Sequence, residues 1–206
     1  MRTTVQPLIE HTGTTMVLAR SDVDTDQIIP ADYCRKVTRT GYADALFARW
    51  RADPGFVLND PERAGATVLV AGRDFGTGSS REHAVWALRD WGFVAVIASS
   101  FGDIFRGNAP KNGLVPVMLP EDAVGVLAAA STANPRLRIT IDLERMEVRG
   151  PSRWPFELEP RARELLLNGF DDVDLTLSHE AGISAYEGDR PRRLPAIGPA
   201  FLEADA

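Results

Sequence analysis

The sequence predicts an α/β fold with a parallel βαβ core. An apolar, β-branched run at residues 66–71 has the composition of a buried strand, and a second such run follows at residues 93–98. Between them lie a loop with three glycines, residues 72–78, and a stretch of helical periodicity, residues 79–91. A strand, a helix and a second strand in this order favour parallel pairing, because the helix carries the chain back across the sheet.

The elements before this unit are short. Residues 15–18 are a strand candidate that leads into an acidic turn at residues 21–26. Pro30 interrupts any regular element behind that turn. Tyr42 to Trp50 is expected to form a helix, and the proline- and glycine-rich residues 51–65 form a connection.

The elements after the unit alternate between strand and helix. Residues 99–113 read as a loop, and residues 114–119 read as a strand whose Pro116 indicates an edge position. The remaining expectations are a helix at 121–130, a hairpin from 137–143 and 146–149, a strand at 156–158 and a helix at 161–168 closed by Gly169. A single domain over residues 1–190 accounts for all of them, with residues 191–206 as a C-terminal tail.

Composition excludes several classes of protein. The 206 residues are 44% hydrophobic and 25% charged with a net charge of −6, which is typical of a globular chain and not of a nucleic-acid-binding one. No apolar run reaches the ~20 residues of a membrane span, and residues 1–10 do not resemble a signal peptide. A cytoplasmic protein is expected. Because Cys34 is the only cysteine, the chain by itself cannot form a disulfide or supply the ligands of an iron–sulfur cluster.

The stretch from Gly78 to His83 carries the strongest chemical signal. It follows a strand and opens a helix, which is where α/β proteins bind ligands and where unpaired N–H groups favour anions. Arg81 opposes the dipole of the expected helix, an unfavourable choice unless its guanidinium binds a carboxylate. A purely structural interpretation is also open, because Ser79 and Glu82 fit the S-x-x-E capping box. His83 is interpreted as a packed or hydrogen-bonded histidine and not as a base.

Four stretches in this order resemble the swivelling domain of the aconitase superfamily. They are residues 23–30, residues 35–41, residues 78–84, and residues 100–105 with Asn108 and residues 112–114. The second stretch and the C-terminal half, including residues 169–172 and 175–177, resemble the small-subunit family of bacterial isopropylmalate dehydratases. The resemblance covers nearly the whole chain. It implies a three-layer β/β/α swivelling domain, like the aconitase C-terminal domain, that closes over an active site on a separate large subunit.

The resemblance implies roles for individual residues. Ser79 corresponds to the serine that removes a proton alpha to a carboxylate, Arg81 to the arginine that binds a substrate carboxylate, and Ser80 to part of the same anion-binding turn. Asp26 is expected to support this site indirectly, by contacting residues that bind the substrate. An aspartate that only forms a turn is an equal alternative. No residue of this chain is expected to bind a metal. The 4Fe-4S cluster of the family is expected on the large subunit, which is therefore the expected protein partner, and a small dicarboxylate is the expected substrate.

The resemblance also implies a reaction and leaves the substrate partly open. The reaction is the isomerisation of 2-isopropylmalate to 3-isopropylmalate by dehydration and rehydration, in leucine biosynthesis. Specificity in the family is read by the loop after Pro30, here with Tyr33, Cys34 and Arg35 as substrate-binding residues. Leucine is usual at the position of Cys34, and the smaller cysteine would shorten the wall of the substrate pocket. The same reaction on another malate derivative, such as citramalate, methylmalate or a compound of specialised metabolism, is therefore the second alternative. A non-catalytic partner subunit that retains the fold is the third alternative. We expect the loop at residues 31–41 to be mobile in the isolated subunit.

Overall fold

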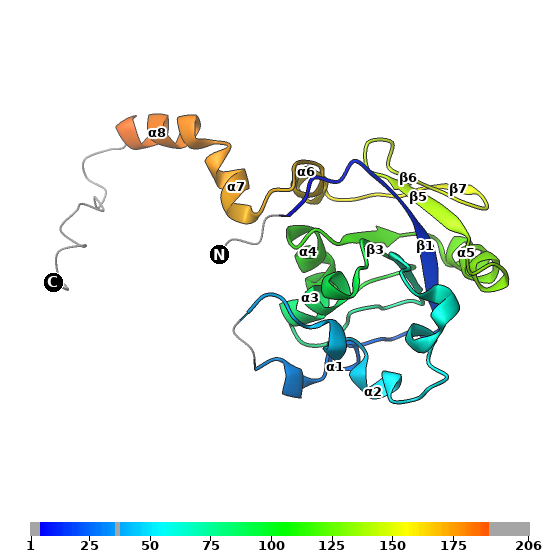
Figure 1. The fold of residues 1–206 in the computed structure, drawn as a ribbon. Helices are drawn as coiled ribbons and strands as arrows, with labels where there is room; N and C mark the ends of the chain where they lie inside the picture. The colour runs from blue at the N-terminus through cyan, green and yellow to red at the C-terminus, as the bar shows by residue number, and fades with distance from the viewer. Residues whose placement is uncertain (1–4, 36–37, 190–206) are drawn as a thin grey trace. The chain divides into compact units, whose positions relative to one another are not determined.

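A computed structural model describes residues 5–35 and 38–189 of the chain (Figure 1). The expected α/β architecture is confirmed. The strands are β1 (Glu10–Leu18), β2 (Val68–Ala71), β3 (Ala95–Ala98), β4 (Val115–Met118), β5 (Arg138–Asp142), β6 (Glu147–Arg149) and β7 (Arg153–Pro155). The α-helices are α1 (Thr25–Ile28), α2 (Ala48–Arg51), α3 (Glu82–Trp91), α4 (Asp103–Lys111), α5 (Glu121–Ala133), α6 (Pro160–Asn168), α7 (Asp172–Leu177) and α8 (Glu180–Asp189).

Strand β1 belongs to two differently built halves of one sheet. The strand order is β4-β3-β2-β1-β5-β6-β7. The second half of β1, Thr15 to Leu18, pairs in parallel with β2, and β3 and β4 continue the parallel pairing. Its first half, Glu10 to Thr14, pairs antiparallel with β5, and β6 and β7 continue from there. The expected parallel core and the expected hairpin at 137–149 are therefore joined through one long strand.

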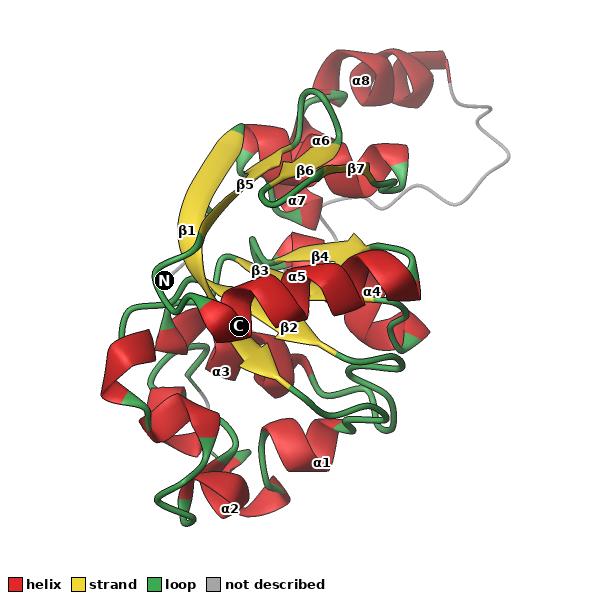
Figure 2. Cartoon of the chain, turned by 90° about the vertical axis from the view of Figure 1, so that its right-hand side faces the viewer, coloured by secondary structure: helices red, strands yellow, loops and turns green. Residues whose placement is uncertain are grey.

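Apolar side chains pack on both faces of the parallel strands, which produces three layers. On one face, alternating residues such as Leu69 and Val96 pack with the buried side chains of α3 and α4. On the other face, Val70 and Ile97 pack with α5 and with apolar side chains of β5 and β6, among them Ile141. Figure 2 shows α5 in front of β2 and β3 in that view. The parallel strands therefore lie between a helical layer of α3 and α4 and a layer formed by the antiparallel strands and α5, which is the expected three-layer domain.

Backbone contacts join the loops that leave the carboxyl ends of β1, β2 and β3. The Gly76 N–H donates to the Val23 carbonyl at 2.7 Å, and the Phe75 N–H donates to the Ser100 carbonyl at 3.1 Å. Isolated bridges also pair Asp24 with Thr77, and Phe75 with Phe101. In Figure 2 these loops and α1 lie beyond the ends of the parallel strands. The glycine-rich loop is therefore held between its two neighbours at the edge where α/β proteins bind ligands.

Glycine is required where two of these loops touch. A Cβ atom on Gly102 would lie 2.5 Å from the Gly76 carbonyl oxygen and 2.9 Å from the Thr77 Cα. Gly76 has a φ of 78°, and a Cβ there would overlap the Phe105 ring at 2.4 Å. The close approach of the loops after β2 and β3 therefore depends on the absence of both side chains.

The structure corrects two expectations about helices. The helix expected from Tyr42 to Trp50 is broken into a 3₁₀ turn (Ala43–Ala45) and the short α2, because Phe47 adopts a left-handed backbone with φ of 47°. Phe47 is fully buried, so packing of its ring accompanies a backbone conformation that the local sequence disfavours. The loop expected at 99–113 contains the nine-residue α4, whose Phe105 and Ala109 face the core. Gly107 and Pro110 inside this helix obscured its periodicity.

Smaller differences concern the ends of elements. The strand expected at 156–158 lies earlier, as β7, and β1 begins at Glu10 and not at residue 15. Pro116 does lie on an edge strand, because β4 ends the sheet. Gly169 ends α6 with a left-handed φ of 66°, as expected.

The contacts within the chain define two compact units, the first ending at Asp171 and the second beginning at Asp172. The second unit contains α7 and α8, and the side chains of α8 are all exposed. The tail expected from residue 191 lies outside the described residues, so the boundary expected there stays a prediction. In the described ranges, every helix is too short or too polar to span a lipid bilayer.

Candidate functional site

The segment Ser79 to Arg81 leaves the glycine-rich loop and leads into α3. The helix begins only at Glu82, with Arg81 as an extended N-cap residue whose side chain makes no capping hydrogen bond. The helix expected from Ser79 is therefore three residues shorter, and the S-x-x-E capping interpretation is wrong. Ser79 and Ser80 are exposed, and neither is used to start the helix. Gly78, with a φ of 92°, provides the turn that precedes them.

The capping box lies instead at α1, in the turn that the sequence marked only as acidic. The Asp24 carboxylate accepts a hydrogen bond from the Gln27 N–H at 2.7 Å, and the Gln27 side chain accepts one from the Asp24 N–H at 2.9 Å. These reciprocal bonds stabilise the first turn of a helix. A separate bond holds α1 against the loop after β2: the Thr25 N–H donates to the Thr77 carbonyl at 2.9 Å.

Asp26 and Arg81 form an ion pair that joins α1 to the start of α3. The Arg81 Nη1 atom donates a hydrogen bond to the Asp26 carboxylate. The Arg81 side chain is 23% exposed and the Asp26 side chain 46%. This hydrogen bond, which outweighs the effect of partial burial, raises the pKa of Arg81 above its usual value. Asp26 is thus a partner of the arginine and not merely a turn residue.

The Arg81 guanidinium retains capacity for a ligand. The bond to Asp26 uses one N–H group, and Arg81 makes no other side-chain hydrogen bond to residues 5–35 or 38–189. A guanidinium offers five donors in a planar fork, so an exposed edge can bind a carboxylate with two parallel bonds. An exposed serine hydroxyl two residues away on the same segment completes an arrangement suited to an anionic substrate.

Cys34 lies close enough to this pair to interact with its charges. The thiol is half-buried against the apolar core and lies 3.9 Å from the Pro30 carbonyl oxygen. Burial raises the pKa of Cys34, the Arg81 charge opposes that rise, and the Asp26 charge adds to it. Cys34, Asp26 and Arg81 therefore form one electrostatic group, although 47 positions separate Cys34 from Arg81 in the chain.

The other loop residues are less closely connected to this group. Tyr33 is 43% exposed, and the Arg35 side chain is largely exposed beside Asp32 at 3.7 Å. No hydrogen bond or ion pair among the described residues joins Tyr33, Arg35 or Ser80 to Arg81. The structure thus brings Asp26 and Cys34 to Arg81, with Ser79 two residues before it in the chain, and leaves the other three exposed. The part of the expected mobile loop at residues 36–37 lies outside the described residues.

His83 is a packed residue, as the sequence predicted. Its ring lies edge-on to Tyr42 at 5.4 Å between centroids and contacts Trp86 at 4.7 Å. Trp86 donates to the Asn112 side chain at 2.9 Å, and Asn112 donates to the Glu82 carboxylate at 2.9 Å. This network holds the first residue of α3 against the end of α4. It was missed in the sequence because its members are far apart and each is common in helices.

The donor set of this chain does not fit an iron–sulfur cluster. Such a cluster needs several thiolates, and Cys34 is the only cysteine of the 206 residues. Across residues 5–35 and 38–189, no three His, Cys, Asp or Glu side chains are grouped as metal ligands. No chemical step of a cluster can therefore be assigned to the residues of this chain.

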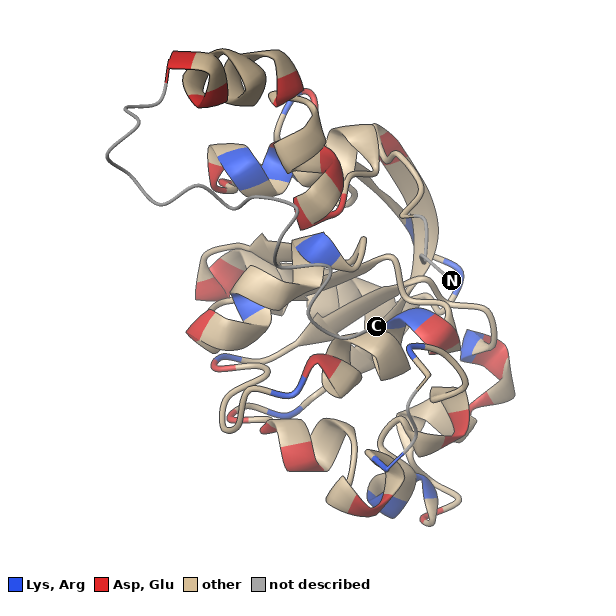
Figure 3. Cartoon of the chain, turned by 90° about the vertical axis from the view of Figure 1, so that its left-hand side faces the viewer, with Lys and Arg blue, Asp and Glu red and all other residues tan. Residues whose placement is uncertain are grey.

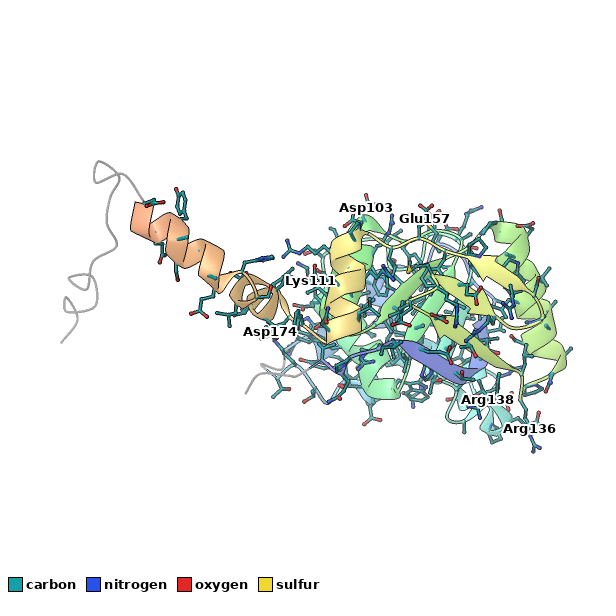
Figure 4. All side chains as sticks on the ribbon, turned by 90° about the horizontal axis from the view of Figure 1, so that it is seen from above. Asp103, Lys111, Arg136, Arg138, Glu157 and Asp174 are labelled. Atoms are coloured by element: carbon teal, nitrogen blue, oxygen red, sulfur yellow. The ribbon has the colours of Figure 1, made fainter. Side chains whose placement is uncertain are left out.

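A cavity of about 330 Å³ lies elsewhere, between α4 and α6. Its lining includes Arg106, Lys111 and Arg161 and no residue of the 79–81 segment. In Figure 4 the labelled Asp103 and Lys111 mark the two ends of α4 beside α6. Figure 3 shows that the loops near α1 carry both basic and acidic residues. The candidate site at residues 79–81 therefore lies apart from this cavity and has exposed polar groups.

Several known proteins are similar to this chain in sequence and in fold. The sequence-family model of the aconitase C-terminal domain matches residues 5–122 of this chain. The chain is 58% identical over 186 residues to a 3-isopropylmalate dehydratase small subunit of Parafrankia sp. (strain EAN1pec), covering 90% of this chain and 95% of that one. It is 55% identical over 192 residues to the small subunit of the same name from Streptomyces coelicolor, with 93% and 98% covered. The chain belongs to the 3-isopropylmalate dehydratase small-subunit family.

A solved structure agrees with this membership. The crystal structure of a 3-isopropylmalate dehydratase from Methanocaldococcus jannaschii matches with a TM-score of 0.66 and 31% identity, covering 86% of this chain and 99% of that one. The family resemblance inferred from the four ordered stretches is therefore confirmed. The matched residues 5–122 contain Asp26, Cys34 and the whole segment from Ser79 to Arg81.

Proposed function

We propose that the chain is the small subunit of a 3-isopropylmalate dehydratase, a hydro-lyase that converts 2-isopropylmalate to 3-isopropylmalate by dehydration and rehydration. The observation that carries the proposal is the Asp26–Arg81 ion pair, whose arginine lies on the same short segment that carries the exposed Ser79. Family membership with 90% of the chain covered supports the reaction type. The cytoplasmic location and the place in leucine biosynthesis follow from this function and stay predictions.

Ser79 is proposed to move the proton. In the dehydration, its oxygen accepts the proton of C3, the carbon alpha to one carboxylate, while the C2–O bond breaks and the hydroxyl leaves as water with a proton from an acid on the large subunit. In the rehydration, water adds at C3 and gives its proton back to that acid, and Ser79 donates its proton to C2, so the hydroxyl has moved from C2 to C3. An unassisted serine hydroxyl is far too weak an acid to act as an alkoxide, so positive charge must stabilise the deprotonated form. The amino end of α3 and the Arg81 guanidinium are proposed to supply such charge from this chain.

Arg81 is proposed to bind a substrate carboxylate. The Asp26 carboxylate offsets part of the arginine's charge, so the main proposed contribution of Asp26 is to orient Arg81. Asp26 accepts from one N–H of the guanidinium and leaves the other N–H groups for a ligand. Ser80, exposed between the two, is proposed to complete the anion-binding turn through its N–H group.

The loop with Tyr33, Cys34 and Arg35 is proposed to contact the variable group of the substrate. Cys34 supports this role because it is half-buried within electrostatic reach of Arg81. Its side chain is smaller than the leucine usual in the family, which favours a second candidate, the same reaction on a smaller malate derivative such as citramalate. One lost apolar contact group changes discrimination by about 1–3 kcal/mol.

The remaining groups of the active site are proposed to lie on a large subunit. The relatives are named small subunits, and the single cysteine of this chain leaves a 4Fe-4S cluster to the partner. We expect no turnover by the purified chain alone and isomerase activity when it is combined with a cluster-bearing large subunit. Turnover of isopropylmalate by the isolated chain would contradict this division of labour.

Ser79→Ala in the reconstituted complex tests the proposed chemistry. Loss of the proton acceptor should lower kcat by about 10³-fold or more while the two subunits still associate. Ser152→Ala is the matched control, because Ser152 is an exposed serine in the turn between β6 and β7. Full activity of the Ser79→Ala complex would indicate that the chain is a non-catalytic partner subunit.

Cys34→Leu tests the substrate assignment. If isopropylmalate is the substrate, the enzyme should prefer it over citramalate before the exchange and prefer it further afterwards, in kcat/KM. If citramalate is preferred before the exchange and isopropylmalate after it, the smaller derivative is the natural substrate.

A further inference from the structure

We propose that Thr25 is a positioning residue for Ser79. This inference rests on the proposed function, since it concerns how the proton-accepting hydroxyl is held. Thr25 is the first residue of α1 and is 3% exposed. Its Oγ1 atom donates a hydrogen bond to the Ser79 carbonyl at 3.1 Å, across 54 positions of the chain.

The Ser79 carbonyl is held from two directions. The Thr25 hydroxyl reaches it from α1, and the Arg81 N–H reaches it along the chain at 2.8 Å. The Ser79 side chain itself is exposed. With its carbonyl directed to the buried Thr25, the residue has little freedom to turn its peptide, so the Cα–Cβ bond that carries the hydroxyl keeps a defined direction.

The Thr25 side chain is itself tightly held. The Asp24–Gln27 capping box fixes the turn in which it lies, and the Thr25 N–H donates to the Thr77 carbonyl at 2.9 Å. Its buried hydroxyl therefore reaches Ser79 from a rigid support. The hydroxyl at this buried position serves as a donor to the segment.

Helix α1 thus makes two separable contacts with the reactive segment. Thr25 binds the main chain of Ser79, and Asp26 binds the side chain of Arg81. The first contact places the group that moves the proton, and the second orients the group that binds the carboxylate. The two residues are neighbours in sequence, but their loss should affect different kinetic constants.

The test compares Thr25→Val, Thr25→Ser and Asp26→Asn in the complex with the large subunit. Thr25→Val keeps the shape and removes the donor, so kcat should fall about tenfold or more with KM changed less than about threefold. Thr25→Ser keeps the hydroxyl and should restore kcat to within about threefold of the original enzyme. Asp26→Asn should act mainly on KM.

Folding should survive the principal exchange. The Ser79 carbonyl keeps its bond from the Arg81 N–H in Thr25→Val, so no buried acceptor is left without a donor. The melting temperature of the isolated subunit is the check. If Thr25→Val does not fold, Thr25→Ala against Thr25→Ser makes the same comparison, with kcat restored by the hydroxyl alone.

Two results would overturn the inference. One is an unchanged kcat in Thr25→Val, and the other is an equal fall in Thr25→Ser, which would assign the effect to packing and not to the hydrogen bond. The Ser79→Ala complex separates this failure from that of the proposed function. If Ser79→Ala is inactive while Thr25→Val is fully active, only the positioning role is wrong.

Discussion

The carboxylate of Asp26, in the four-residue helix α1, accepts a hydrogen bond from the Arg81 guanidinium at the amino end of α3. The pair connects the loop after β1 to the loop after β2 across 55 positions of sequence. It orients an arginine whose remaining donors are available to an anion, and it brings that arginine within reach of Cys34.

Asp26→Asn should raise KM by about five- to fiftyfold with a smaller change in kcat. The exchange removes the negative charge that strengthens this hydrogen bond and orients Arg81, a loss of about 1–2 kcal/mol once the partial exposure of the pair is taken into account. Asp26 also repels an anionic substrate, but its side chain is nearly half exposed and water screens that repulsion. Steady-state kinetics of the complex is the measurement. Asp32→Asn, a largely exposed aspartate on the neighbouring loop, is the control, and an equal effect there would contradict the orienting role.

The Cys34 thiol should react slowly with iodoacetamide in the isolated folded subunit. Burial raises its pKa, so at a given pH it has less thiolate than free cysteine, and its reaction rate should keep rising above the usual thiol pKa. Mass spectrometry follows the modification cleanly, because Cys34 is the only cysteine. The protein unfolded in urea is the control and should react like free cysteine.

Variants of the neighbouring charges should move that rate in opposite directions. Arg81→Ala removes a charge that lowers the pKa of Cys34 and should slow alkylation at fixed pH. Asp26→Asn removes a charge that raises it and should accelerate alkylation. Equal rates in both variants would mean that Cys34 lies outside the Asp26–Arg81 group in solution.

Gly102→Ala should destabilise the subunit by about 1–3 kcal/mol, because the new methyl group would lie 2.5 Å from the Gly76 carbonyl oxygen. A drop in melting temperature of roughly 3–10 °C follows for a chain of this size. Gly107→Ala is the matched control: it lies inside α4 with no atom within 4 Å of the new Cβ. That variant should be stabilised by up to about 1 kcal/mol, since alanine favours a helix. Similar melting temperatures for both variants would show that the loops do not pack so closely.

Asp142 should stabilise the fold only above the pH at which its carboxyl group protonates. The N–H groups of Arg145 and Glu144 and the Arg145 guanidinium lower the pKa of Asp142 against the opposing effect of burial. A carboxyl group with a lowered folded-state pKa contributes fully above the ordinary aspartate value of about 3.9, and the contribution is lost as the pH falls through the folded-state pKa.

Urea unfolding at several pH values tests this dependence with Asp142→Asn. The stability difference from the original chain should be large near pH 7 and shrink steadily below about pH 4. Glu144→Gln, an exposed carboxylate in the same turn, should show a small difference that depends little on pH. A pH-independent deficit in Asp142→Asn would assign the role of Asp142 to shape alone.

Local patterns predicted much of the framework. The apolar runs that became β2 and β3 are buried at every position, and alternation or helical spacing is not needed to recognise such strands. The broken helix around Phe47 and the hidden helix α4 were missed for a common reason. In both, tertiary packing of an aromatic ring, Phe47 or Phe105, outweighs the local preference of the chain.

Sequence analysis named candidate site residues but not the contacts between them. Ser79 and Arg81 stood out because an arginine at the start of a helix and an S-x-x-E pattern are visible in a short window. That same pattern suggested a capping box that does not form, whereas the capping box at Asp24 and Gln27 was overlooked within an acidic turn. Thr25 had no local signal, since a threonine becomes informative only when its partner is known.

Sequence alone determined the fold class, the family resemblance, and the inability of one cysteine to hold a cluster, because each depends on residue types in local order. The tertiary structure decided which side chains meet. Parallel strands bring their carboxyl ends to one edge, so residues 25 and 26 reach residues 79 and 81 through space while the chain between them forms much of the core. Contacts of that length are set by sheet pairing and packing, and no short stretch of sequence encodes them.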